Sequence, residues 1–151
     1  MLMRRQNGMQ YVQSRLVRLK NDFVDFFTPF YGEQVAKQLG DLLERHIGFI
    51  SQYTAVVQTN EPTEPVREAL YTDIDEIARL LAAINPHWAE NTWRTLLQNQ
   101  SYLEEELIFA LDRGYGEAIA KYDEMYANIE QIIAYMKDGI TMQFGSVESQ
   151  A

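Results

Sequence analysis

The chain has 151 residues, of which 46% are hydrophobic and 23% charged, and its formal net charge is −9. It is long enough to bury a core, and because it contains no cysteine, disulfides, thiolate nucleophiles and cysteine metal sites are excluded. The negative charge disfavours nucleic-acid binding, no apolar run approaches the roughly 18 residues of a membrane span, and the basic opening MLMRRQNGMQ lacks the apolar segment of a signal peptide. We therefore expect a cytoplasmic protein.

The N-terminal part of the chain predicts short helical pieces. Residues 1–8 are expected to be disordered. One short helix is predicted over 9–19 and another over 22–27, and Thr28-Pro29 interrupts the pattern because the residue before a proline disfavours helical backbone. These pieces form a short N-terminal helical extension.

Four longer helices follow, over residues 31–59, 64–84, 90–114 and 115–144. Each carries apolar residues at alternating spacings of three and four, which is typical of an amphipathic helix. Pro65 suits the first turn of the second of these helices, Asn85-Pro86 ends it, and Gly114 separates the last two. On the last helix the residues predicted to face inward are Ile119, Tyr126, Ile129, Ile133, Met136 and Ile140.

No segment shows the alternation of apolar and polar residues that indicates a strand, so the fold class is predicted to be all-α. Four amphipathic helices joined by short loops favour an antiparallel up-down four-helix bundle. We expect residues 9–144 to form this bundle as a single domain and residues 145–151 to be a disordered C-terminus.

Polar side chains interrupt the apolar face of every long helix. Measured from the connecting turns, they fall within about one helical turn (5.4 Å) of a common central layer. One hypothesis is a metal site for iron or manganese, or a site for a small polar ligand. The residues that would form it are His46, Asp73, Glu104 and Asp123.

The other hypothesis is a hydrogen-bonded polar layer that fixes the register of the helices, with His46 donating to Asp73 or to a tyrosine. We prefer it because a di-iron bundle uses Glu-x-x-His on two helices, and this chain has no such motif and only two histidines. The acidic run Glu104–Glu106 points in several directions around a helix, so most of it is expected to be solvated.

Three segments, DFVDFFTPFYGEQVAKQL, TDIDEIARLLAAINPHWAENTWRTLL and DGITMQF, together resemble a small, functionally uncharacterised helical family of Gram-positive, spore-forming bacteria. The resemblance covers about residues 15–144. Some members carry the label acetylglutamate kinase, which implies an α/β fold that a helical pattern cannot supply, so we reject that activity. His46, Asp73 and Asp75 match the family pattern, whereas Gln100 stands where members tend to have histidine.

Family members also begin with a further helix that has no match in this chain. An apolar groove left uncovered by its absence predicts self-association or a protein partner. The residues expected to make that contact are the aromatic side chains nearest to it: Tyr11, Phe23, Phe26, Phe27 and Phe30.

Taken together, these features predict a non-enzymatic helical bundle that acts through protein–protein contacts, as a homo-oligomer and without a cofactor. The alternative is a metal- or small-ligand-binding bundle built around the central histidine and carboxylates. Neither function involves nucleic acid or a membrane.

Overall fold

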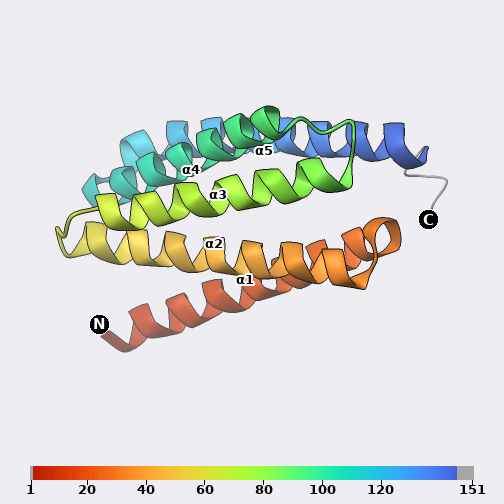
Figure 1. The fold of residues 1–151 in the computed structure, drawn as a ribbon. Helices are drawn as coiled ribbons and strands as arrows, with labels where there is room; N and C mark the ends of the chain where they lie inside the picture. The colour runs from red at the N-terminus through yellow and green to blue at the C-terminus, as the bar shows by residue number, and fades with distance from the viewer. Residues whose placement is uncertain (1, 146–151) are drawn as a thin grey trace. The chain divides into compact units, whose positions relative to one another are not determined.

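The computed structural model describes residues 2–145, and of residues 2–13, 16 and 115 it describes the backbone alone. This part of the chain forms five helices and no strand, so the predicted all-α class is confirmed (Figure 1). The helices are α1 (Leu2–Tyr31), α2 (Glu33–Gln58), α3 (Glu64–Ile84), α4 (Glu90–Arg113) and α5 (Tyr115–Phe144). The four long helices therefore lie within two residues of their predicted bounds. The predicted disorder of residues 145–151 falls, apart from Gly145, outside the described residues.

The N-terminal extension is one long helix rather than two short pieces. α1 begins at Leu2, so it includes most of the segment 1–8 for which we expected no regular structure. The predicted break at Thr28-Pro29 is wrong, because Pro29 lies inside the helix. Pro29 stands two residues before the last residue of the helix, so its missing N–H affects only the final turn, and the Thr28 hydroxyl donates to the Val24 carbonyl oxygen at 2.7 Å.

The chain divides into two compact units, and the boundary lies after Gly48, inside α2. Unit 1 comprises residues 1–48 and unit 2 residues 49–151. The single domain predicted over 9–144 stays a prediction.

In unit 1, α1 and the first half of α2 form a helical hairpin. Gly32 ends α1 with a φ of 86°, a left-handed conformation that favours glycine, and its N–H donates to the Thr28 carbonyl oxygen at 2.9 Å. The two helices approach closely at Gly40, where an added Cβ would lie 2.6 Å from a Val24 methyl group. Lys20 and Glu44 form an ion pair across the hairpin at 2.9 Å.

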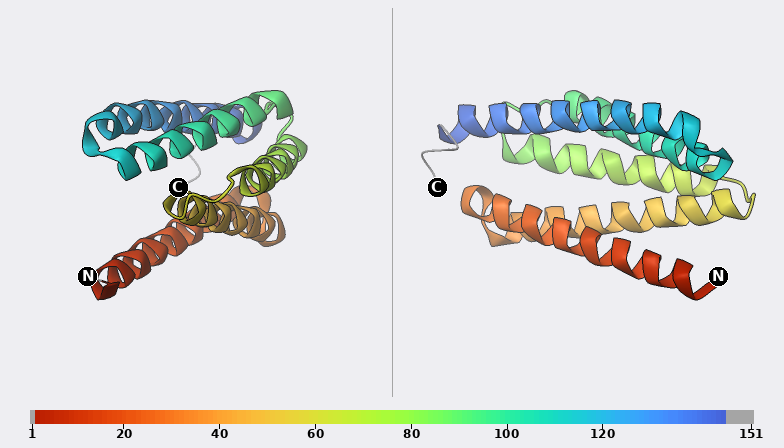
Figure 2. Two further views of the ribbon diagram at one scale, coloured as in Figure 1. Left: turned by 90° about the vertical axis from the view of Figure 1, so that its left-hand side faces the viewer. Right: turned by 180° about the vertical axis from the view of Figure 1, so that it is seen from behind.

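In unit 2, α4 is the central helix and packs against both α3 and α5 (Figure 2). Successive helices of this unit run in opposite directions (Figure 1). The end of α2 packs against the start of α3 through an apolar cluster that also includes Ile108 of α4. Its buried members are Tyr53, Val57, Val66 and Leu70.

A tryptophan-rich turn between α3 and α4 attaches this connection to α5. Asn85 adopts an extended backbone ahead of Pro86 and ends α3, and its side-chain oxygen accepts the His87 N–H at 2.9 Å. Trp88 is 2% exposed, its indole N–H donates to the Tyr135 carbonyl oxygen at 3.3 Å, and it fills the space beside Gly139. One side of the C-terminal third of α5 is therefore covered by this turn, which we call the tryptophan turn (residues 85–89).

None of the helices in the described part of the chain combines the length and the apolar character needed to cross a membrane.

Candidate functional site

The four predicted metal ligands lie in four different surroundings. His46 is half-buried on the part of α2 that belongs to unit 1. In unit 2, Asp73 on α3 is 1% exposed, Glu104 on α4 is half-buried, and Asp123 on α5 is exposed. The prediction that Asp73 faces inward is confirmed, whereas Asp123 points to solvent.

Among the residues that the structure describes, no three His, Asp or Glu side chains form a group that could hold a metal ion. Within unit 2, Asp73 is buried and Asp123 is exposed. The iron or manganese site therefore stays a prediction, and the structure leads to other features of the same helices.

A network of amide side chains joins α4 to α5. Asn128 of α5 is 4% exposed, and its side-chain NH₂ donates to the Leu96 carbonyl oxygen at 3.2 Å and to the Gln100 Oε1 at 3.0 Å. Asn99 donates to the Asn128 Oδ1 at 2.9 Å, and Gln100 in turn donates to Glu104 at 3.3 Å. Because these bonds satisfy each other only at one relative position of the helices, the network fixes the register of α4 against α5. Glu104 therefore belongs to a hydrogen-bonded layer of the predicted kind.

Glu105, rather than Glu104, is the most buried acid of the run 104–106. It is 4% exposed, and its Oε2 lies 3.2 Å from the Nε of Arg67 on α3. Burial raises the pKa of the Glu105 carboxyl, and the positive charge of Arg67 opposes this shift. The expectation that this acidic run is mostly solvated is therefore wrong at its central residue, since that residue faces α3.

Tyr53 of α2 lies in the same region as Glu105 and Arg67. Burial, and then the negative charge of Glu105, raise the pKa of the Tyr53 phenol to about 12. Arg67 has its pKa raised by a hydrogen bond to Tyr71 and by the Glu105 charge. The phenol is thus neutral at physiological pH, and the cluster joins α2, α3 and α4 without presenting a reactive group to solvent.

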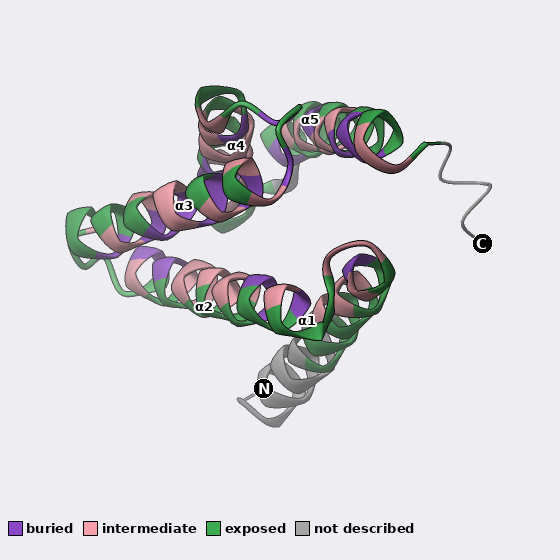
Figure 3. Cartoon of the chain, turned by 45° about the vertical axis from the view of Figure 1, so that its right-hand side comes forward, coloured by how far each residue is buried: buried purple, intermediate pink, exposed green. Residues whose placement is uncertain are grey.

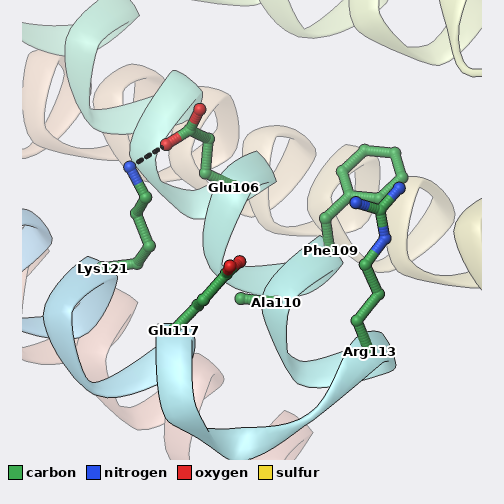
Figure 4. A pocket seen from close by; sticks show the side chains of 6 residues that line it. All are labelled: Glu106, Phe109, Ala110, Arg113, Glu117 and Lys121. Carbon is green, nitrogen blue, oxygen red and sulfur yellow. Dashed lines mark ion pairs between the residues drawn. The ribbon is translucent and has the colours of Figure 1, made fainter.

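A pocket of about 320 Å³ lies beside the turn between α4 and α5 (Figure 4). Charged side chains of both signs line it together with one aromatic ring. The residues are Glu106, Phe109, Ala110 and Arg113 of α4 and Glu117 and Lys121 of α5.

The positive groups of this pocket are already engaged by the protein. Lys121 forms an ion pair with Glu106, and the Arg113 guanidinium lies 5.7 Å from the centre of the Phe109 ring. The Lys121 ammonium, and then the Tyr102 hydroxyl, donate to the Glu106 carboxylate and lower its pKa. We therefore interpret the pocket as part of an ion-paired contact between α4 and α5.

The aromatic residues predicted to bind a partner are mostly packed among themselves. Phe27 is fully buried and stacks between Phe23 and Tyr31, with ring centres 4.7 and 5.5 Å away. Phe23 and Phe30 are half-buried, and Phe26 is 37% exposed. The side chain of Tyr11 lies outside those that the structure describes. Of the predicted contact residues, Phe26 is thus the described one most open to a partner.

The largest departure from the sequence prediction is on α5. Ile119, Tyr126 and Ile133, all predicted to face inward, are 68%, 55% and 44% exposed, and Tyr122 on the same face is 54% exposed. We call these four residues the α5 strip. Further along the same face Met136 and Ile140 are buried, as predicted, because the tryptophan turn covers that end of the helix.

The sequence prediction misplaces the strip because the strongest hydrophobic pattern of α5 is not on its buried side; the helix has both buried and exposed residues (Figure 3). The buried residues Ala118, Asn128 and Gly139 have little or no hydrophobic signal, although Asn128 bonds to α4 and Gly139 lies against Trp88. Strong hydrophobic residues instead follow the spacing 119, 122, 126, 129, 133, which continues over about two heptads. That narrow heptad spacing is more typical of a contact between two helices than of a broad core face. It is the sequence signal that could have indicated an interaction surface on this helix.

Compared with protein family models, curated proteins and solved structures, the chain gives no match. The resemblance to a helical family of spore-forming bacteria therefore stays a prediction, and the function is argued from the geometry alone.

Proposed function

We propose that this protein acts by binding another protein, a second copy of itself, through the α5 strip, and that it does so as a non-enzymatic, cytoplasmic protein. The observation that carries the proposal is the exposure of four large apolar side chains on one face of one helix. Two tyrosines and two isoleucines at heptad spacing provide the surface that a second helix packs against.

The strip differs from ordinary exposed apolar residues in its continuity. Single exposed hydrophobic side chains are normal on protein surfaces, whereas contiguous patches are typical of interaction sites. Ile119 and Ile133 are about 21 Å apart along the helix, at a rise of about 1.5 Å per residue. Half-buried Ile129 fills the interval between Tyr126 and Ile133, so the surface has no polar interruption on this face.

The experiment is analytical ultracentrifugation of the full chain over a wide concentration range. We expect concentration-dependent self-association, weakened at least about tenfold by Tyr126→Glu, since a buried charge at such a seam costs more than 1.4 kcal/mol. Ala127→Glu is the matched control, because it places the same charge on the next, exposed residue but off the strip. A monomer at every concentration, or equal association of both variants, would contradict the proposal.

As the scaffold for this surface we propose the antiparallel up-down bundle of α2–α5 predicted from the sequence. Its support is the alternating direction of the successive helices of unit 2 and the extended packing of α4 against α3 and α5 (Figure 2). Spin-label distances between α2 and α5 test whether the fourth side of the bundle is closed.

A further inference from the structure

The charges of the chain are strongly segregated along the sequence. Residues 1–20 contain five basic residues and no acidic one, whereas the remaining 131 residues contain the other eight basic residues and all 22 acidic ones. The formal charge is therefore +5 for the first segment and −14 for the rest. Such a distribution gives one chain two surfaces that attract each other.

The basic segment is helical and has apolar side chains open to solvent. It forms the first two-thirds of α1. Among its described side chains, Val17 and Leu19 are 49% and 62% exposed, and Arg15 and Arg18 are also exposed. Lys20 is engaged by Glu44 within unit 1. Arginines and apolar residues together are what a helix needs to pack on an apolar surface with an acidic border.

The α5 strip has such a border. Asp123 and Glu130 follow Tyr122 and Ile129 directly, so they lie along the solvent side of the strip, and both are exposed. The strip is about 21 Å long and the helical segment 2–20 about 27 Å, so one basic segment can cover the whole strip.

We propose that the basic N-terminal segment of α1 (residues 2–20) of one copy docks on the α5 strip of a second copy. This inference rests on the proposed function, because it names the part of the second copy that the strip binds. The apolar side chains provide the contact area, and arginines opposite Asp123 and Glu130 provide its orientation.

A negatively charged membrane is the other surface that a basic amphipathic helix fits. The observations favour the second copy, since the remaining 131 residues carry a formal charge of −14, which an anionic membrane would repel. If α1 bound a membrane instead, the α5 strip would also have no helix to cover it.

The test is a charge exchange in the full chain, followed by sedimentation equilibrium. We expect Arg15→Glu/Arg18→Glu and Asp123→Lys/Glu130→Lys each to weaken self-association about tenfold or more, and the four changes together to restore most of it. Lys37→Glu/Arg79→Glu is the control, since it changes the net charge as much as the arginine pair does but lies elsewhere. Raising the salt from about 50 to about 500 mM is expected to weaken the wild-type contact.

The outcomes separate this inference from the proposed function. One outcome is that Tyr126→Glu yields monomers but neither pair of charge changes has an effect beyond the control. The strip then binds a different part of the second copy, which contradicts the inference but supports the proposed function. The inference is also overturned if both double variants lose self-association and the fourfold variant does not recover it. So does a monomeric chain that binds phosphatidylserine vesicles through Arg15 and Arg18, and that outcome overturns the proposed function as well.

Discussion

At the scale of single residues, Gly139 stands at a position where even one added methyl group would collide with a neighbouring side chain. The Trp88 indole lies against its backbone, so a Cβ at this position would overlap the ring and not just touch it. The ring cannot move freely, because its N–H donates to the Tyr135 carbonyl oxygen and it makes a T-shaped contact with Trp93 at a centre distance of 5.4 Å. Glycine is needed here for space and not for backbone freedom.

We therefore expect Gly139→Ala to lower the free energy of unfolding by about 1–3 kcal/mol, as overpacking of a buried contact does. The matched control is Gly116→Ala on the same helix, where no atom lies within 4 Å of an added Cβ. That change is expected to be worth less than about 1 kcal/mol and to be stabilising. Urea unfolding followed by tryptophan fluorescence measures both, and equal stability of the two variants would contradict the packing described for Trp88.

At the scale of the helices, α4 and α5 are held in register by the Asn128 network. We expect Asn128→Ala to cost about 1–3 kcal/mol, because it leaves the Gln100 Oε1 and the Leu96 carbonyl oxygen without a donor that they now have. Gln131→Ala, at an exposed position one turn away, is expected to change stability by less than about 0.5 kcal/mol. Hydrogen exchange of the α5 amides is the second measurement, and unchanged protection in Asn128→Ala would count against a register role.

The sequence predicts the long helices well because their ends carry local signals. Asn85-Pro86 and Gly114 act within a few residues, and both end a helix where expected. It fails at Pro29, where the interruption comes too close to the helix end to break it. The faces are harder to predict, because which side of a helix is buried depends on its neighbours. Glu105 is buried since Arg67 lies opposite, and Ile119 is exposed since the tryptophan turn reaches only the far end of α5.

The candidate sites are also only partly predictable, because their burial depends on how the helices pack. The central polar layer is predictable in part, because Asp73 interrupts an apolar series on α3 and is buried there. The burial of Asn128 and Glu105 is not predictable, since both look like solvated residues in the sequence and become buried only when the helices pack. The α5 strip was visible in the sequence as a heptad, but its exposure follows only from the arrangement of unit 2.

At the scale of the whole molecule, this acidic chain buries two of its described carboxyl groups, those of Asp73 and Glu105, almost completely. Carboxylates on the surface of a protein with a charge of −9 repel each other only weakly through solvent. Glu105 differs because burial raises its pKa, so its ionised form destabilises the folded state relative to the unfolded one. Glu105 should therefore contribute to the pH dependence of stability with a sign opposite to that of Glu106, whose pKa is lowered.

Glu105 contributes stability that is fully present below its ordinary pKa of 4.5 and is lost as the pH rises through its higher, folded-state pKa. Glu105→Gln removes this loss while the amide oxygen can still accept a hydrogen bond from Arg67. We expect the variant to match the wild type near pH 4 and to be more stable by about 1 kcal/mol near pH 7, because a neutral amide avoids the cost of burying a charged carboxylate. Urea unfolding at both values measures the difference. If the variant loses stability relative to the wild type between pH 4 and pH 7, the attraction of Arg67 for the carboxylate outweighs the cost of burying it.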